Sequence, residues 1–485
     1  MKLPRPTHMG TKAQSYFSEA RATLLLALPI MAGHVSQVLM GITDSYMVGL
    51  VGKVPFAASS FANAVFGLFF IAGIGLLMPV PVLVARARGE GRPRECGEFL
   101  RHGLLVAAVF GAIETAALLA LSFHLHLFDQ PPEVVEATGA YFRIVTVSIL
   151  PVLVFQVLRQ YSEAMGRPWE PMFILLACVA LNVALNWILI YGNLGAPRLG
   201  LVGAGWATLI ARTVAAVVLL QRLRRAARGG GAGGTARAAG ASAAGAEAAG
   251  AEAREAWPAR WFARVERARA GVMLRIGVPA MGQFLFEGGA FVAAAVMMGW
   301  FNSVDPIAAH QIALNCASFT FMIVLGIASA AGIRVGQCAG AGERERLRVA
   351  GFGAVAMCVA WMTFSAAAIS LGRWEIAGWF RQDAAVTAMA AQFLVVAAVF
   401  QIFDGMQVVG ANMLRGLADV KVPTLITFVA YWVIALPLGY FYGVRGTGGP
   451  PGIWIALAAG LAFAAVALTA RFARLSRVKS LQTRH

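Results

Sequence analysis

Residues 171–192 read PMFILLACVALNVALNWILIYG, a run of 22 residues without a charged side chain. A helix of about 20 apolar residues crosses the roughly 30 Å hydrocarbon core of a bilayer, so this stretch predicts a transmembrane helix. The whole composition agrees, because 59% of the residues are hydrophobic and only 13% are charged, which is unlike a soluble domain. With a mean hydropathy of +0.71, the chain is predicted to be an all-α polytopic membrane protein.

Apolar runs of similar length recur along the chain between Arg, Gly and Pro breaks. They predict twelve transmembrane helices, near residues 25–50, 56–85, 102–127, 137–163, 171–192, 201–223, 275–300, 307–334, 350–372, 388–415, 423–443 and 450–472. The first run is too long for the core of a signal peptide and carries Asp44, so we expect an uncleaved span. The predicted domains are an N-terminal tail 1–24, an N-lobe 25–223, a linker 224–272, a C-lobe 273–472 and a C-terminal tail 473–485.

The net charge of +17 fits membrane topology better than nucleic-acid binding. With both termini in the cytoplasm, the cytoplasmic segments and the adjoining ends of the spans hold 33 of the 40 Lys and Arg residues and the external loops hold five, while Arg143 and Arg212 lie deeper within spans. Neither a zinc finger nor a helix-turn-helix pattern accompanies the charge, so we expect no nucleic-acid partner. We expect an integral protein of a bacterial cytoplasmic (inner) membrane with lipid around it, and these counts predict that both termini are cytoplasmic.

Residues 226–256 are rich in Ala and Gly and lack apolar periodicity, which predicts a flexible cytoplasmic linker without a function of its own. The five cysteines include no CxxC pair, and three of them lie inside apolar runs. They therefore indicate neither a disulfide framework nor a metal site.

The sequence also repeats itself at an offset of about 250 residues. Pro29 and Pro279 open equivalent spans, and Gly49 corresponds to Gly299. Six helices followed by six more, each half starting inside, predict a parallel repeat of two six-helix lobes. Such duplication is typical of secondary transporters, whose binding site lies between the repeats.

The sequence contains no phosphate-binding loop, HExxH or GxSxG motif, so we expect neither an enzyme nor a nucleotide-driven pump. Four acids lie well inside spans: Asp44, Glu114, Glu287 and Asp404. A charged side chain at the centre of a membrane helix costs roughly 2.5–3.5 kcal/mol on insertion scales. Each acid is therefore either a carrier of a proton or cation, or a neutral group hydrogen-bonded between helices.

Two groups of polar residues could form such a carrier site. Asn182 and Asn186 are four residues apart and share one helix face, and with Asp44 they would form an oxygen-rich site for a cation or a proton. The alternative is that the two amides only join helices. Glu287 and Asp404, if they meet, would share a proton or hold a cation between them.

Other residues in the spans carry weaker signals. Phe284, Met298, Phe400 and Met406 could line an adaptable apolar cavity for a substrate, or could simply pack between helices. Glu114 has no comparable polar neighbours in the sequence, and a structural role is equally compatible with it.

Several of these stretches, in order, resemble the multidrug and toxic compound extrusion (MATE) family, and its NorM-type branch in particular. They are PIMAGHVSQVLMGITDSYMVG at 29–49, GLLMPVPVLVARARGEG at 75–91, YSEAMGRPWEP at 161–171, LNVALNWILIYG at 181–192 and FDGMQVVGANMLRGLADVKVPTLITFVAYWVIALPLGY at 403–440. The resemblance covers nearly the whole chain except the linker and tails. Some relatives have a tyrosine one turn before the acid of span ten, where this chain has Phe400.

The resemblance implies a V-shaped bundle of two six-helix lobes that exports cationic amphipathic drugs in exchange for Na⁺ or H⁺. It implies a role in cation coupling for Glu287 and Asp404, with Na⁺ as one possible occupant. It also implies that Asp44, with Asn182 and Asn186, forms a cation or proton site in the N-lobe. No cofactor is expected beyond the coupling ion, and we expect a monomer.

Two other functions are compatible with a polytopic membrane protein. A lipid-linked oligosaccharide flippase of a related fold would need basic residues in its cleft to hold pyrophosphate, and the acids within the spans outnumber Arg143 and Arg212. A membrane enzyme or receptor would need a catalytic constellation or a large extramembrane domain. The sequence indicates neither, so a cation-coupled drug antiporter is the favoured prediction.

Overall fold

The computed structural model describes residues 12–128, 130–228, 250–258, 261, 264–301, 303, 305–380 and 383–477. Within these ranges the chain forms helices and turns, with no β-strand. Twelve helical segments in this part of the chain are long and apolar enough to cross a membrane, which confirms the predicted number. The all-α polytopic class predicted from the sequence is therefore correct.

The helices of unbroken spans are α1 (Lys12–Gly49), α4 (Pro93–Leu121), α7 (Trp169–Tyr191), α8 (Leu201–Ala227), α11 (Arg267–Gly299), α12 (Asp305–Gly340), α13 (Arg344–Leu371), α15 (Ala384–Gly416) and α18 (Gly449–Leu475). The second span is broken into α2 (Lys53–Leu77) and α3 (Pro79–Gly89), and the fourth into α5 (Pro132–Val147) and α6 (Ile149–Ala164). Short helices η1 (Leu125–Phe128), η2 (Asn193–Gly195) and α14 (Arg373–Trp379) connect some of them.

The eleventh span is irregular, with α16 (Lys421–Phe428), η3 (Val429–Ala435), α17 (Leu436–Leu438) and η4 (Gly439–Val444) in succession. Both η3 and η4 are π-helical. Pro437, which has no backbone N–H to donate, lies between them in α17. Wider π-helical turns of this kind are rare in proteins, and those that do occur are often found at functional sites.

Several helices begin earlier than the apolar runs predicted. The third span begins at Pro93 rather than near residue 102, and the seventh at Arg267 rather than near 275. A helix can continue through polar turns, and a hydropathy reading does not count these turns as part of the span. Pro93 also suits a helix start, because the first turn needs no backbone N–H donor from it.

The described residues divide into two compact units: unit 1 contains those within 35–277, and unit 2 contains 12–34 together with those within 278–477. The division falls inside α1 and inside α11, and each of these helices contains a proline, Pro29 and Pro279 respectively. Compared with the lobes expected from the sequence, each unit therefore also contains the first part of the helix that opens the other half of the chain.

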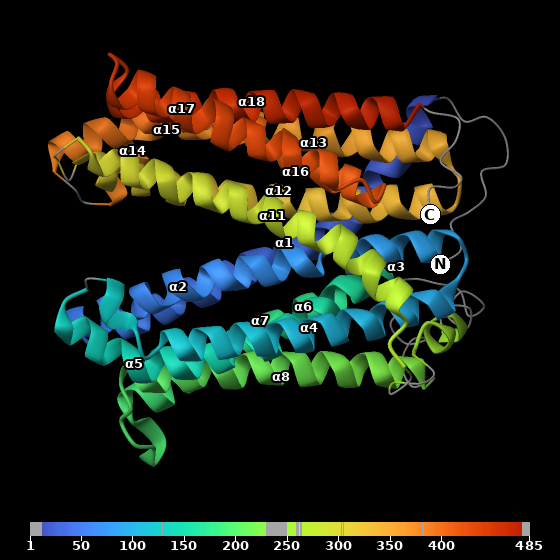
Figure 1. Cartoon of the computed structure of the whole chain (residues 1–485), viewed down its shortest axis with the longest axis horizontal. Helices are drawn as coiled ribbons and strands as arrows, with labels where there is room; N and C mark the ends of the chain where they lie inside the picture. Colours follow the sequence, from blue (N-terminus) through green and yellow to red (C-terminus); the bar gives the residue numbers. More distant parts are fainter. Residues whose placement is uncertain are drawn as a thin grey trace. The chain divides into compact units, whose positions relative to one another are not determined.

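In unit 1, the second half of the fourth span is the central element. Of the 16 residues from Ile149 to Ala164 in α6, 13 are buried, including polar side chains. Helix α6 packs against α3, α4 and α8, and α7 packs against α8. Figure 1 shows these helices in blue to green, with their long axes roughly along the horizontal direction of the view. This packing brings the inner faces of α7 and α8 together.

In unit 2, α15 is the central helix and packs against α12, α13 and α18 (Figure 1). The backbones of α12 and α15 approach closely, since a Cβ atom at Gly416 would lie 2.5 Å from the carbonyl oxygen of Gly332. Small residues allow membrane helices to pack at this distance. Almost the whole second half of α15, from Asp404 to Gly416, is consequently buried.

Candidate functional site

The first polar site, in unit 1, joins α1, α7 and α8 around Asp44. Asn186 Nδ2 donates a hydrogen bond to Asp44 Oδ1, and Thr208 Oγ1 donates to Asp44 Oδ2 over 3.2 Å. Asn186 Nδ2 also donates to Asn182 Oδ1 over 3.2 Å, and both amide side chains are fully buried. The structure thus brings together the three residues selected from the sequence and adds Thr208. We call these four residues the unit 1 site.

An arginine lies beside this site. Arg212 is one helical turn after Thr208 on α8, and it interacts electrostatically with Asp44. Its Nη1 donates to Ser148 Oγ over 2.6 Å, and its guanidinium carbon lies 4.8 Å from the centre of the Phe66 ring. Ser148 occupies the break between α5 and α6. Arg212 thus provides a positive charge next to the Asp44 carboxyl.

A groove of about 460 Å³ lies next to the unit 1 site, between the ends of α1 and α7. Its lining includes three aromatic side chains, Tyr46, Trp187 and Tyr191, and also Thr43, the neighbour of Asp44. Tyr191 is held in place by a 2.9 Å hydrogen bond from its hydroxyl to the Met47 carbonyl oxygen. Aromatic ring faces beside a carboxyl group are surroundings in which an organic cation binds well.

The second polar site, in unit 2, contains the predicted pair of acids. Glu287 on α11 and Asp404 on α15 interact electrostatically, and Gln407 hydrogen-bonds to Glu287. Asp404 and Gln407 are three residues apart and share one face of α15. Asp404 is buried, with 7% of its surface exposed, whereas Glu287 is half-buried. We call Glu287, Asp404 and Gln407 the unit 2 site.

A buried arginine accompanies this site as well. Arg415, in the last turn of α15, interacts electrostatically with Glu287. Its Nη2 donates to Gln283 Oε1 over 2.8 Å, and its guanidinium carbon lies 5.0 Å from the Phe284 ring centre. Sequence reasoning identified neither Arg415 nor Gln407 as part of the site. The one available signal was the spacing of Gln407 from Asp404.

The four residues predicted to line a substrate cavity have different surroundings. Met298 and Phe400 lie in the packed apolar core of unit 2, with 0% and 1% of their surfaces exposed. Phe284 and Met406 are half-buried. Their role in binding a substrate stays a prediction.

Glu114, the remaining acid inside a span, is buried and isolated. Neither carboxyl oxygen has a hydrogen-bond partner among the described residues. Its Oε2 lies 3.2 Å from the position that a Cβ atom would take at Gly73, and the Leu153 side chain packs against the same glycine. Nothing in these contacts links Glu114 to either polar site.

No group of three or more His, Cys, Asp and Glu side chains in the described part of the chain is arranged to hold a metal ion. A monovalent cation does not need three such side chains. One or two carboxylates, together with neutral oxygen atoms, are ligands that a hard cation accepts. The donor set of the unit 2 site is compatible with Na⁺ or a proton.

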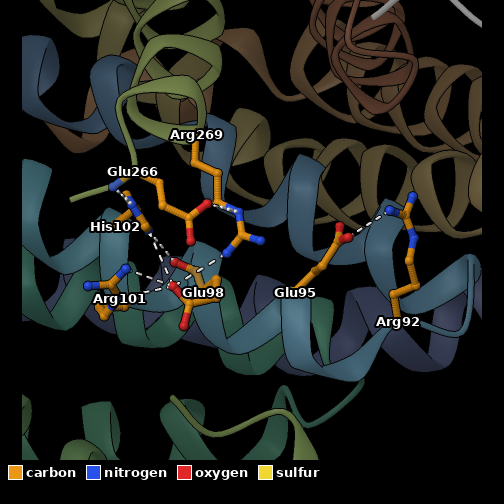
Figure 2. Close-up of polar contacts among 7 residues, drawn as sticks. All are labelled: Arg92, Glu95, Glu98, Arg101, His102, Glu266 and Arg269. Atoms are coloured by element: carbon orange, nitrogen blue, oxygen red, sulfur yellow. Dashed lines mark hydrogen bonds and ion pairs between the residues drawn. The ribbon is translucent and has the colours of Figure 1, made fainter. Parts of the chain in front are cut away.

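A third polar cluster in unit 1 has a structural character (Figure 2). Glu98 on α4 pairs with Arg101 at 2.8 Å and with Arg269, at the start of α11, at 3.4 Å. The backbone N–H of Glu266 donates to His102 Nε2 over 3.3 Å. Figure 2 shows these side chains converging on Glu98, so the cluster attaches the beginning of α11 to α4.

The last part of the predicted linker is also attached to unit 1. Glu252 pairs with Arg88 Nε at 2.7 Å, and the Tyr161 hydroxyl donates to the Ala256 carbonyl oxygen over 2.8 Å. Ala256 is fully buried, and a Cβ atom at Gly97 would lie 2.7 Å from its oxygen. Residues 229–249 of the linker lie outside the described part of the chain.

A sequence model of the MatE family matches residues 29–188 and again residues 279–441. The chain belongs to the MATE family. The two matches begin at Pro29 and Pro279, which confirms the repeat with an offset of 250 residues that the sequence suggested. The resemblance to MATE transporters drawn from the five sequence stretches is likewise correct.

Relatives of this MATE protein are named as multidrug resistance proteins. It is 33% identical over 476 residues to a probable multidrug resistance protein NorM of Mesorhizobium japonicum, covering 95% of each chain. It is 32% identical to a protein of the same name from Rhizobium meliloti, over 96% of this chain and 95% of the relative. As expected from the sequence, the MATE protein is therefore a membrane transporter and not an enzyme.

Solved structures of MATE transporters share the fold. A transporter of the MOP superfamily from Pyrococcus furiosus superimposes with a TM-score of 0.83 at 19% identity, covering 95% of this chain and 97% of the other. At this identity, the likeness establishes the fold alone.

Proposed function

We propose that this MATE protein is a secondary active multidrug efflux antiporter, which exports cationic amphipathic compounds in exchange for Na⁺ or H⁺. The naming of its relatives as multidrug resistance proteins supports drugs as the exported class. The gradient of the coupling cation supplies the energy, and no cofactor takes part.

The charge balance of the unit 2 site carries this proposal. When both acids are ionised, Glu287 and Asp404 contribute two negative charges, and Arg415 is the positive charge that interacts with Glu287. One negative charge then remains in a setting of low dielectric constant, where an unpaired charge is costly. Uptake of one Na⁺ or one proton removes that imbalance, so we propose that the coupling cation binds here.

The unit 1 site has a different balance. Asp44 has Arg212 as a neighbouring cation, and each of its oxygens already accepts a hydrogen bond from an N–H or O–H donor. A sodium ion needs oxygen lone pairs that face it, and it would also be repelled by the guanidinium group. We therefore propose that Asp44 exchanges a proton rather than a metal ion, with Asn182 and Asn186 holding its carboxyl in position.

Exchange follows if cation and drug compete. Entry of a cation at the unit 2 site reduces the negative charge that attracts a cationic drug, and so lowers the affinity for the drug. Binding of the drug lowers the affinity for the cation by the same factor. The aromatic groove beside Asp44 supports a place for the apolar part of a drug. Phe284 and Met406 are candidates for a second contact surface near the acids.

The orientation follows from the distribution of charge along the sequence. We propose that the protein lies in a bacterial cytoplasmic membrane as a monomer, with both termini and the linker in the cytoplasm. The excess of Lys and Arg in the predicted cytoplasmic segments supports this arrangement.

Efflux of ethidium from proteoliposomes, with Na⁺ and pH gradients imposed separately, tests the proposal. We expect uphill ethidium movement under at least one of the two gradients, and none in liposomes that contain Asp404→Asn. Equal ethidium movement with and without the gradients would contradict cation coupling.

The flippase alternative is supported less well by the residues. It needs basic groups that are free to bind pyrophosphate, whereas Arg212 and Arg415 each lie next to a carboxyl group. Transport of a lipid-linked pyrophosphate, and not of cationic dyes, would support it.

A further inference from the structure

Tyr431, on the π-helical segment η3, is fully buried, yet its hydroxyl has no hydrogen-bond partner among the described residues. A buried hydroxyl without a partner is unfavourable, because it gives up its hydrogen bonds to water and gains none in the protein. Such a group in a folded protein calls for an explanation. One explanation is that the hydroxyl contacts a bound ligand or ion. Its position on a π-helical turn points in the same direction, because such turns are frequent at functional sites.

Contacts on both sides of Tyr431 place it opposite the middle of α11. One turn earlier, Thr427 Oγ1 accepts a 3.2 Å hydrogen bond from Gln283 Nε2. The ring of Tyr431 itself lies 6.1 Å from the ring of Phe291. Glu287 is one turn after Gln283 and one turn before Phe291, so it lies on the α11 face that η3 covers.

Phe291 also connects Tyr431 to α15. The Phe291 ring lies 6.1 Å from the ring of Phe400, which is one turn before Asp404 on the same helix face. Tyr431 accordingly interacts electrostatically with both acids, Glu287 and Asp404. Three helical elements of unit 2 therefore converge on this point.

Three oxygen atoms in this region have no hydrogen-bond partner in the described part of the chain: Asp404 Oδ1, Gln407 Oε1 and the Tyr431 hydroxyl oxygen. All three side chains are at least 90% buried. A carboxylate, an amide and a hydroxyl oxygen are the ligand types that a hard cation takes. Glu287 on α11 interacts electrostatically with Asp404 and with Tyr431, and Arg415 on α15 interacts with Glu287. The titratable thiol of Cys358, on α13, also interacts with Asp404.

We propose that the Tyr431 hydroxyl is an additional oxygen of the unit 2 cation site, which contacts the coupling cation together with Asp404 and Gln407. This inference rests on the proposed cation-coupled function. If the cation is Na⁺, the hydroxyl oxygen is a neutral ligand of the ion. If it is a proton, the hydroxyl hydrogen-bonds to the carboxyl group that exchanges it. Phe400, one turn before Asp404, offers no oxygen for either task.

Sodium binding to the purified full-length protein tests the first case. In detergent at constant pH, NaCl replaces choline chloride at constant ionic strength, and the thermal unfolding midpoint is measured, because a bound ligand stabilises the folded state. We expect Tyr431→Phe to need a roughly three- to ten-fold higher Na⁺ concentration for half of the stabilisation. A role in packing alone would leave this concentration unchanged.

Proton release tests the second case. Tetraphenylphosphonium is added to the protein in Na⁺-free, weakly buffered solution, and a pH indicator measures the protons released over a series of starting pH values. We expect Tyr431→Phe to shift the pH of half-maximal release by about 0.5–1 unit, the same free-energy change as above.

Two further variants decide between outcomes. Tyr440→Phe is the matched control, since it removes a hydroxyl from the other π-helical segment, where that group accepts a 3.0 Å hydrogen bond from Arg445 Nε. We expect it to behave like the wild type in both experiments. Asp404→Asn should abolish the response.

The results separate this inference from the proposed function. If the wild type responds, Asp404→Asn does not, and Tyr431→Phe matches the wild type in both experiments, the inference about Tyr431 is wrong and the cation site stands. If the wild type responds to neither Na⁺ nor the cationic drug, the cation site itself is wrong, and the role of Tyr431 is wrong with it.

Discussion

Asp44 and Asn186 are 142 residues apart in the sequence, and Asn186 Nδ2 donates a hydrogen bond to Asp44 Oδ1. Thr208, from a third helix, donates to the other oxygen of the same carboxyl group. An acid that would be costly in a membrane helix is thereby surrounded by donors and by the Arg212 cation. The Arg212 guanidinium interacts electrostatically with Asp44, and mutations can test how much this interaction contributes to stability.

Arg212→Gln should destabilise the protein, because it removes the cation next to Asp44 and leaves the carboxyl uncompensated. We expect a loss of about 1–3 kcal/mol in the free energy of unfolding, less than for a fully buried pair since Arg212 is partly exposed. Asp44→Asn combined with Arg212→Gln should be more stable than Arg212→Gln alone, because neither charge then remains. Thermal unfolding in detergent measures both effects. A double variant whose losses simply add would indicate that the two side chains act independently.

Glu287→Gln and Asp404→Asn should each abolish active efflux while expression stays near normal. Each change removes a group that can bind a cation or proton and hardly changes the side-chain volume. Ethidium efflux under an imposed cation gradient measures the loss, with liposomes lacking the protein as the background. Glu343→Gln is a matched control, because this partly exposed acid pairs with Arg346, away from the unit 2 site. Efflux at the wild-type rate in both site variants would mean that the acids are structural.

The linker should contain a dispensable part and a required part. Deletion of residues 229–249 is expected to leave ethidium efflux largely intact, since a segment of this composition needs only to connect the two halves. Extending the deletion to residue 257 also removes the Arg88–Glu252 ion pair and the hydrogen bond from Tyr161 to Ala256. We expect this longer deletion to lower the thermal unfolding midpoint and the efflux rate. Equal behaviour of the two deletions would show that these contacts contribute little.

A protease site inserted near Gly234 should be cut only from the cytoplasmic side. The prediction follows from the segregation of Lys and Arg in the sequence, because cytoplasmic loops retain these residues. Everted vesicles and intact cells treated with the same protease provide the comparison. Cleavage in intact cells would invert the proposed orientation.

The number of spans and the residues of the two polar sites could be predicted from the sequence to different extents. Each span is a local property, set by how many consecutive apolar residues cross the bilayer, and all twelve were predicted. Their ends were predicted less accurately, as at Pro93, because a helix continues into polar sequence. Asp44, Glu287 and Asp404 were visible from the sequence alone, because an acid inside an apolar run is conspicuous.

The neighbours of these acids were a matter of tertiary structure. Nothing in the sequence connects Thr208 with Asp44 or Tyr431 with Phe291, since those contacts depend on how distant helices are packed and rotated about their axes. The side chains of an ordinary Thr, Gln or Tyr in a span are also too common to stand out. The sequence by itself therefore determined a twelve-helix MATE transporter with acids inside its spans, while packing decided that Arg212 lies beside Asp44, and that Gln407 and Arg415 interact with Glu287 in unit 2.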